Sequence, residues 1–213
     1  MSKCRIFIVR HTQTVGNIEK RLTGRHDYEI TDIGNEYIEL LTQELKDVKF
    51  DEIYSSPSGR AKKTIMPLAK LNNKTIIENQ DLSEMYFGIY DGWTWEEVNK
   101  VNPQIKQTQI EINEIVGIPE QEAMEEVAER MYKCIQNISN ESLGKTILIA
   151  SHGVAIEAFL RKIVQVPFSK EREKFCQHNT AINEVVYEDG KFNILRLADM
   201  KHINIKEQSD GAR

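Results

Sequence analysis

The stretch IFIVRHTQT, residues 6–14, decides the fold, because an apolar run at residues 6–9 passes directly into Arg10 and His11. A short apolar run that is bounded by polar residues is typical of a strand buried on both faces. Two cationic-type side chains stand where this strand ends. Hydroxyl and amide groups follow them at residues 12–14. We interpret this strand end as a place where an anion is held.

Strand-like and helix-like segments alternate along the rest of the chain. Apolar runs predict further strands at residues 52–55, 75–78 and 146–150. Helical periodicity predicts helices at residues 31–48, from 56 to about 71, 122–138 and 154–164. Thr31 is placed to cap the first helix. That helix is expected to bury Ile33, Tyr37, Leu40, Leu41, Leu45 and Val48. Two late runs, residues 182–187 and 192–197, flank Glu188-Asp189-Gly190 and predict a tight hairpin.

This alternation predicts the fold class. Strands alternating with helices, followed by a hairpin, indicate a three-layer α/β/α sandwich whose central sheet is mostly parallel and covered by helices on both faces. The whole chain, residues 1–213, is expected to form one domain. Residues 81–119 are less regular, and we expect residues 93–122 to form a small insertion that covers the ligand site. Residues 201–213 are expected to form a C-terminal tail.

The predicted strand ends converge. Ligands of such sheets bind beyond the carboxyl ends of the strands. Arg10 and His11 end the first strand, and Arg60 follows the second strand by one helical turn after Ser55-Ser56. Residues 151–153 (Ser-His-Gly) end the strand at 146–150. Three strand ends therefore bring two arginines and two histidines to one edge of the sheet.

Composition excludes several classes of protein. The formal net charge is −5, whereas a nucleic-acid-binding protein usually carries an excess of basic residues, so we expect no nucleic-acid partner. The three cysteines, Cys4, Cys134 and Cys176, contain no C-x-x-C pair, so buried free thiols are expected and a zinc site is not. The apolar run before Arg10 is too short for a signal peptide or a membrane span. We therefore expect a cytoplasmic protein without a membrane partner.

The clustered residue types suit phosphoryl transfer without a metal. A neutral imidazole can attack phosphorus and form a phosphohistidine. Guanidinium groups bind phosphoryl oxygens bidentately, and a second histidine can bind the same oxygens as a cation. A carboxylic acid must protonate the leaving oxygen and later activate water.

The sequence also resembles the histidine phosphatase superfamily, in its phosphoglycerate mutase-like branch. The family pattern R-H-G-E-T-x-x-N aligns with residues 10–17, and the following arginine, glycine and D-x-x-L-T-x-x-G match residues 21–34 with Ile30 for leucine. S-S-x-x-x-R-A-x-x-T matches residues 55–64, and L-x-E-x-x-F-G-x-x-x-G matches residues 82–92. S-H-G and the late N-x-x-I match residues 151–153 and 179–182. The matches keep the family's order and extend to about residue 198.

The resemblance implies a role for each matched residue. His11 would be the nucleophile, Glu84 would be the proton donor and later the base, and Arg10, Arg60 and His152 would form the phosphate pocket. Substrate binding would involve Asn17, Thr23, Gly24 and Gly153. Such enzymes need no metal and no other cofactor for catalysis. Glu122 resembles the glutamate of a family turn and is expected only to support the site from behind.

Two residues depart from the family pattern. Thr12 replaces a glycine and Gln13 replaces a glutamate. Glycine would permit a positive φ at this position, whereas threonine requires an ordinary backbone conformation and adds a hydroxyl group. Neither change removes a catalytic group, so activity is expected.

The sequence favours a phosphatase over a mutase. Mutases place a basic pair in a longer insertion between the acid and the second histidine. Here Lys100 and Lys106 are the only cations between Trp95 and Pro119. Against this, the dipeptide Thr23-Gly24 resembles the sequence that mutases have in the loop at this position. A cofactor-dependent phosphoglycerate mutase therefore remains an alternative, and a non-catalytic phosphate-binding module is a further one.

The expected partner is a small phosphorylated metabolite. The family suggests a sugar phosphate, phosphoglycerate or α-ribazole 5′-phosphate, and the sequence does not choose among them. Trp93 and Trp95 could stack on a ligand or could fix the insertion to the core. Homodimers are common in this architecture, and no sequence feature decides whether this chain forms one.

Overall fold

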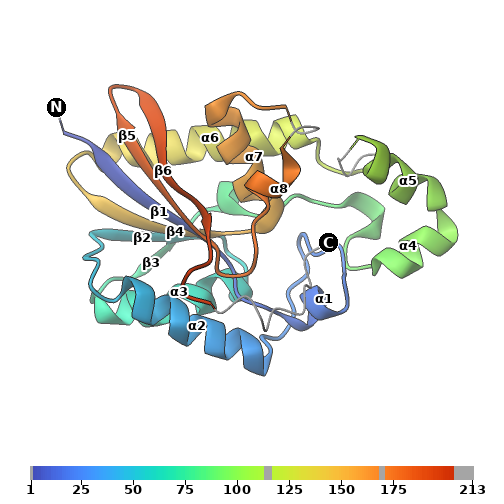
Figure 1. The fold of residues 1–213 in the computed structure, drawn as a ribbon, viewed down its shortest axis with the longest axis horizontal. Coiled ribbons are helices and arrows are strands. Elements are labelled where there is room, and N and C mark those ends of the chain that lie inside the picture. Colours follow the sequence, from blue (N-terminus) through green and yellow to red (C-terminus); the bar gives the residue numbers. More distant parts are fainter. Residues whose placement is uncertain (1, 113–116, 168–170, 204–213) are drawn as a thin grey trace.

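A computed structural model describes residues 2–112, 117–167 and 171–203 of the chain. Its centre is a six-stranded sheet with the order β3-β2-β4-β1-β5-β6 (Figure 1). The strands are β1 (Cys4–Arg10), β2 (Glu52–Ser55), β3 (Ile76–Glu78), β4 (Thr146–Ser151), β5 (Ile182–Glu188) and β6 (Lys191–Asp199). The pairs β3-β2, β2-β4 and β4-β1 are parallel, and β5 is antiparallel to both of its neighbours. The predicted mostly parallel sheet and the final hairpin are confirmed.

Helices cover both faces of this sheet, which confirms the three-layer α/β/α sandwich. On one face lie α2 (Asp32–Leu45) and α3 (Gly59–Leu71), and on the other lie α6 (Met124–Glu141) and α7 (Gly153–Val164) (Figure 1). The shorter helices are α1 (Val15–Ile18), α4 (Trp95–Val101), α5 (Pro103–Ile112) and α8 (Arg172–Phe175), with 3₁₀ turns η1 (Gln80–Leu82) and η2 (Gly88–Tyr90). Thr31 caps α2 as predicted, accepting a hydrogen bond from the Gly34 amide at 2.9 Å.

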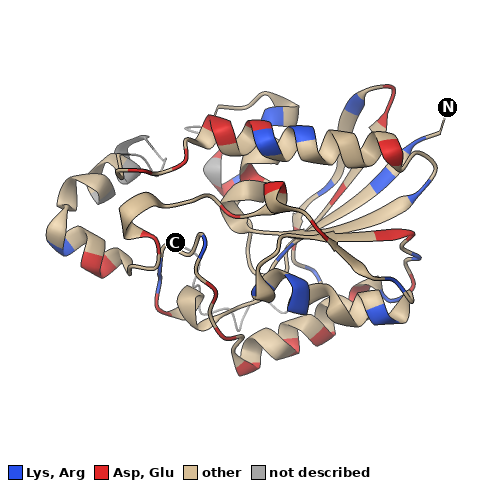
Figure 2. Ribbon diagram, turned by 180° about the vertical axis from the view of Figure 1, so that it is seen from behind, with Lys and Arg blue, Asp and Glu red and all other residues tan. Residues whose placement is uncertain are grey.

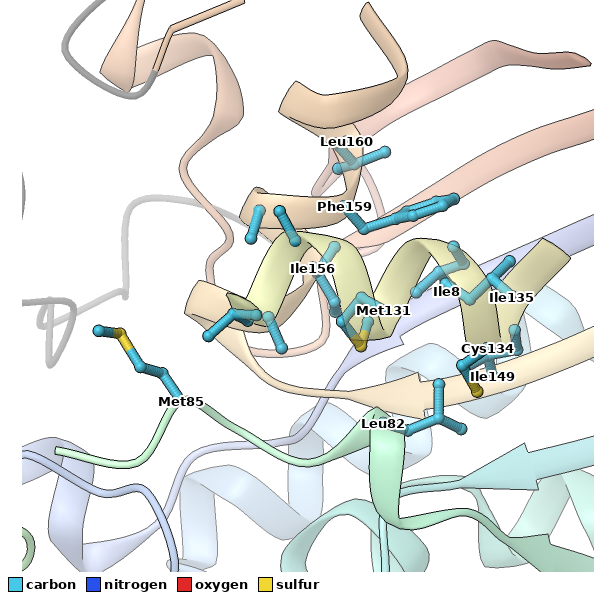
Figure 3. Close-up of a cluster of buried hydrophobic side chains, with 14 of the residues drawn as sticks. Ile8, Leu82, Met85, Met131, Cys134, Ile135, Ile149, Ile156, Phe159 and Leu160 are labelled. Atoms are coloured by element: carbon cyan, nitrogen blue, oxygen red, sulfur yellow. The ribbon is translucent and has the colours of Figure 1, made fainter. Parts of the chain in front are cut away.

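Strand β1 divides the hydrophobic core in two, because successive side chains of a strand point to opposite faces. Ile6 and Ile8 pack with α6 and α7, whereas Phe7 and Val9 pack with α2 and α3. Figure 3 shows Ile8 on β1 within the cluster formed by α6 and α7. Full burial of an aliphatic side chain contributes about 1.5–3 kcal/mol. Both layers therefore hold β1 and fix the position of its carboxyl end.

The structure corrects three local predictions. The buried face of α2 includes Ile38, whereas Ile33 and Leu40 are 38% and 41% exposed, so the predicted stripe was partly wrong. Helix α3 begins at Gly59 after a Ser58 cap, later than predicted. The less regular region contains the helices α4 and α5. These two helices were not predicted because this region has too few apolar residues to show the spacing of a buried helix face.

Backbone contacts join the last residues of the predicted insertion, 119–121, to the segment that follows Glu84. Phe87 and Gln121 form an isolated antiparallel bridge, and the Ile89 amide donates to the Pro119 carbonyl at 3.1 Å. Gly88 has a φ of +57°, and a Cβ atom there would lie 1.9 Å from the Pro119 carbonyl oxygen. This close approach requires glycine. Across the described parts of the chain, no helix combines the length and apolar character needed to cross a membrane.

Candidate active site

The two site histidines follow neighbouring strands. In the parallel pair of β1 and β4, Arg10 is the register partner of Ser151. His11 and His152 are the next residues, and their ring centroids lie 5.2 Å apart. The strand register therefore brings together two histidines that are far apart in the sequence, as predicted.

His11 is held in a neutral form that can act as a nucleophile. Its Nδ1 lies 2.7 Å from the Thr12 carbonyl oxygen, which can only accept, so Nδ1 carries the proton and Nε2 carries the lone pair. The residue is 3% exposed. Burial, followed by the positive charges of Arg60 and Arg10, lowers the pKa of His11 well below its ordinary value. The imidazole is therefore neutral at pH 7, the form that can attack phosphorus.

His152 is neutral as well, which differs from the cation that was predicted. Its Nδ1 accepts a hydrogen bond from Nη2 of Arg60 at 3.0 Å, so the proton lies on Nε2, 2.8 Å from Oγ of Ser56. Burial, then the charges of Arg60 and His11, lowers the pKa of His152 well below its ordinary value. The Nε2–H group is a neutral donor at the site.

The two arginines provide buried donors without acceptors. The Nε atoms of Arg10 and Arg60 are buried and have no hydrogen-bond partner in the described structure. Such groups are rare in proteins, because each one costs about 1–3 kcal/mol. A bound phosphoryl oxygen would satisfy them. Gly153 leaves the Arg10 guanidinium uncovered, since a Cβ atom there would lie 3.4 Å from Nε.

Glu84 sits at the amino end of α7. Its Oε1 accepts from the amides of Met85 and Ala155, both at 2.9 Å, and its Oε2 accepts from the Val154 amide at 3.1 Å. Burial raises the pKa of Glu84 above its ordinary value, although the three amides act in the opposite direction. A carboxyl group with a raised pKa retains its proton to higher pH and can donate it to a leaving oxygen.

The sequence analysis missed Arg130, which holds the loop that carries Glu84. Its Nη1 donates to the carbonyls of Asp81 and Ser83 at 2.7 and 2.8 Å, and its Nη2 donates to the Glu84 carbonyl at 3.2 Å. It also binds Glu122 bidentately, with distances of 2.6 and 3.0 Å. Helical spacing could have indicated this residue, because Arg130 lies three residues after the buried Val127 and therefore on the same face of α6.

The predicted binding residues take different places. The side-chain hydrogen bonds of Asn17 in the described structure end on Oδ1, with Thr14 and Asn179 as donors, which leaves Nδ2 available to donate to a ligand. The Thr23 hydroxyl donates to the Arg21 carbonyl at 3.2 Å, while its own carbonyl accepts from Arg60. Gly24 lines the cavity beside the site.

This cavity has a volume of about 750 Å³, and two of the predicted catalytic residues, Glu84 and His152, line it. The strand ends and the Glu84 loop contribute Ser56, Ser58, Glu84 and His152 to its wall. Among the described residues of the predicted insertion, 120–122 are the ones that line it, and neither tryptophan does. Trp95 packs against the hydrophobic core instead. The described residues contain no group of three or more His, Cys, Asp or Glu side chains arranged to hold a metal ion.

The two departures from the family pattern are accommodated without strain. Thr12 does not have a positive φ, and its hydroxyl donates to the Gly34 carbonyl at 2.6 Å. Its amide donates to Oγ1 of Thr64 at 2.9 Å. Oε1 of Gln13 accepts from the Thr31 hydroxyl at 2.8 Å, next to the start of α2. Thr12 therefore joins β1 to α2 and α3 and contacts His11 only through the backbone.

Replacing Thr12 by valine should reduce stability and leave catalysis nearly intact. The Thr12→Val variant loses one buried hydrogen bond, worth about 1 kcal/mol, while the carbonyl that holds His11 remains. Denaturant unfolding should show this loss of stability. If the full 1 kcal/mol were lost from the transition state, turnover would fall about fivefold, so a change of less than about threefold would show that the hydrogen bond mainly supports the fold. The exposed Thr75→Val exchange is the matched control. A tenfold loss of turnover without a loss of stability would contradict this assignment.

Comparison with known proteins agrees with this geometry. Residues 6–200 match the model of the histidine phosphatase superfamily (branch 1), and the chain therefore belongs to that family. Enzymes of this family include both phosphatases and mutases. The chain is 25% identical over 185 residues to the probable phosphoglycerate mutase GpmB of Yersinia pestis, covering 87% of this chain and 86% of that protein.

Solved structures show the same fold. YhfR of Bacillus stearothermophilus superposes with a TM-score of 0.89 at 24% identity, covering 94% of this chain and 100% of that one. The phosphoserine phosphatase of Entamoeba histolytica superposes with a TM-score of 0.78 at 23% identity, covering 93% of this chain and 98% of that one.

Proposed function

We propose that this chain is a metal-independent phosphatase that hydrolyses small phosphate monoesters through a phosphohistidine on His11. The observation that carries the proposal is the state of His11: a buried, neutral ring whose Nδ1 is fixed by the Thr12 carbonyl, so that Nε2 is the nucleophile. Attack by Nε2 forms the N–P bond as the bond from phosphorus to the alcohol oxygen breaks.

The surrounding groups complete this reaction. The donors of Arg10 and Arg60 would bind the phosphoryl oxygens and offset their charge in the transition state. Protonated Glu84 would transfer its proton to the departing alcohol oxygen. The resulting carboxylate would then take a proton from the water that attacks the phosphohistidine. The products are the alcohol and inorganic phosphate, and His11 and Glu84 return to their starting states.

A phosphatase is favoured over the mutase alternative by the insertion. The described residues that it contributes to the cavity are Glu120, Gln121 and Glu122, and none of them is a cation. A mutase must keep water away from the phosphohistidine and retain an anionic phosphoglycerate while it reorients. Acidic residues at the entrance do not favour such retention.

Phosphate release from a panel of monoesters in the presence of EDTA tests the proposal. Turnover should persist with EDTA, and in a parallel assay the conversion of 3-phosphoglycerate to its 2-isomer should be slower than phosphate release. Isomer conversion that exceeds phosphate release would establish the mutase instead. Binding of inorganic phosphate without turnover of any ester would establish the non-catalytic module.

A further inference from the structure

The segment that carries Glu84 is anchored on both sides of it by apolar side chains. Leu82 and Met85 are fully buried and belong to the same core cluster as residues of α6 and α7 (Figure 3). Ser83 and Glu84 lie between them and are polar, so burial in the core does not hold these two residues. Hydrogen bonds to their backbone must fix where the Glu84 side chain begins.

Arg130 supplies these hydrogen bonds from α6. Its neighbours along the chain include Val127 and Met131, which are both fully buried, so the core fixes the place of this helical turn. All five N–H groups of the guanidinium are used. Three donate to the carbonyls of residues 81, 83 and 84, and two donate to the carboxylate of Glu122. Lysine carries its three donors on a single nitrogen and could not form this fork.

Glu122 holds the same segment on the other side of Glu84. Its amide donates to the Tyr86 carbonyl at 3.0 Å, and its Oε2 accepts from the Tyr86 amide at 3.3 Å. The Arg130–Glu122 pair therefore contacts the backbone before and after the acid. Because the two charges offset one another, the pair adds no net charge beside a carboxyl group that must keep its proton.

Charge alone does not distinguish Arg130 from its neighbours on α6. Acidic and basic residues both occur along this helix (Figure 2). Lys133 forms an ion pair with Glu129 in which the side chains are 68% and 46% exposed, and such surface pairs contribute little to stability. The side chains of Arg130 and Glu122 are 20% and 21% exposed. Lys133 is therefore a suitable control on the same helix.

We propose that Arg130 and Glu122 are positioning residues for proton transfer, which hold Glu84 where it can protonate the departing alcohol and later activate water. This inference rests on the proposed phosphatase activity. Both residues act through Glu84. A catalytic group that is misplaced by about 1 Å can lose about 10²-fold in rate. Loosening the pair should therefore slow the steps that need Glu84 and spare the step that does not.

Arg130→Gln tests this role with two esters. For glycerol 3-phosphate, whose leaving oxygen needs a proton, kcat should fall about 10²-fold. With p-nitrophenyl phosphate, the first equivalent of p-nitrophenol should form at a rate within about threefold of the wild-type rate, because this leaving group needs no proton. Lys133→Gln makes the same change in net charge and should leave both rates unchanged.

A double variant shows whether Arg130 acts through Glu84. In the Glu84→Gln background, Arg130→Gln should cost less than about threefold with glycerol 3-phosphate, since the acid that it positions is already absent. Glu122→Gln should give the same pattern with a loss of about tenfold, and it tests the pair where Arg130→Gln does not fold. Equal losses for both esters, or the same loss in both backgrounds, would overturn the proposal.

Amide hydrogen exchange reports the position of Glu84 without turnover. The Val154 and Ala155 amides lie in the first turn of α7, where no acceptor exists within the helix, and Glu84 accepts from both. They should exchange at least about tenfold faster in Arg130→Gln and at the wild-type rate in Lys133→Gln. Unchanged exchange in Arg130→Gln would refute the positioning role, even if the wild-type protein is a phosphatase. Faster exchange in a protein whose wild type hydrolyses no ester would refute the phosphatase and support the positioning of Glu84.

Discussion

Replacing His11 by alanine is expected to abolish turnover, with a loss of at least about 10⁴-fold in kcat. The variant lacks Nε2 of His11, the proposed nucleophile, and therefore cannot form a phosphohistidine at this position. Alkaline quenching of the wild-type enzyme during turnover of a ³²P-labelled monoester should trap acid-labile label on the protein. His11→Ala should carry no label.

The binding of inorganic phosphate provides the control for this variant. Arg10 and Arg60 keep their buried donors when His11 is removed, so phosphate affinity should fall less than about tenfold. His178→Ala is the matched histidine exchange and should retain turnover and label. Covalent label that persists in His11→Ala would place the nucleophile elsewhere.

Replacing Glu84 by glutamine should separate the two halves of the reaction. Glutamine keeps an oxygen acceptor for the α7 amides and can neither donate nor take the catalytic proton. Turnover of an alkyl monoester such as glycerol 3-phosphate should fall about 10²–10⁴-fold. With p-nitrophenyl phosphate, whose leaving group needs no proton, the first equivalent of p-nitrophenol should appear as a burst. Slow turnover should follow, because no base activates water.

The pH profile gives a second measure of this residue. Glu84 must be protonated to act as the acid, so wild-type kcat/KM for an alkyl monoester should decline as pH rises through the pKa of Glu84. Burial raises that pKa, which moves the decline to higher pH than an exposed glutamate would give. Titration of the substrate phosphate affects both proteins equally. A decline of the same size in Glu84→Gln would show that another group is the acid.

The sequence predicted the central site because strand ends carry its residues. Arg10-His11 and His152 follow apolar runs, and parallel strands deliver their carboxyl ends to one edge. Arg130 was not found, since its importance lies in hydrogen bonds to the Glu84 loop, at least 46 positions away in sequence. Periodicity describes one element at a time and cannot show such long-range pairs.

Long-range packing also decides features of the fold and of the site that the sequence pattern did not predict. Helix α5 carries a polar sequence, so its existence depends on neighbours that the pattern does not reveal. In α2, Ile33 and Leu40 were predicted to be buried and Ile38 was not, whereas the packing against the sheet buries Ile38 and leaves the other two exposed. The neutral state of His152 likewise depends on Arg60, which is 92 positions away in sequence.

The position of His11, whose ring lies 5.2 Å from that of the cavity residue His152, has a stereochemical consequence in the proposed reaction. Glu84 lines the cavity, and in the proposed reaction it would protonate the departing alcohol and later activate the water, so both would react on the side of phosphorus that faces away from His11. Each in-line displacement inverts the configuration at phosphorus. Two inversions restore it, so a chiral phosphoryl group would pass from ester to acceptor with overall retention. The use of one histidine for both displacements would thus set the handedness of the product.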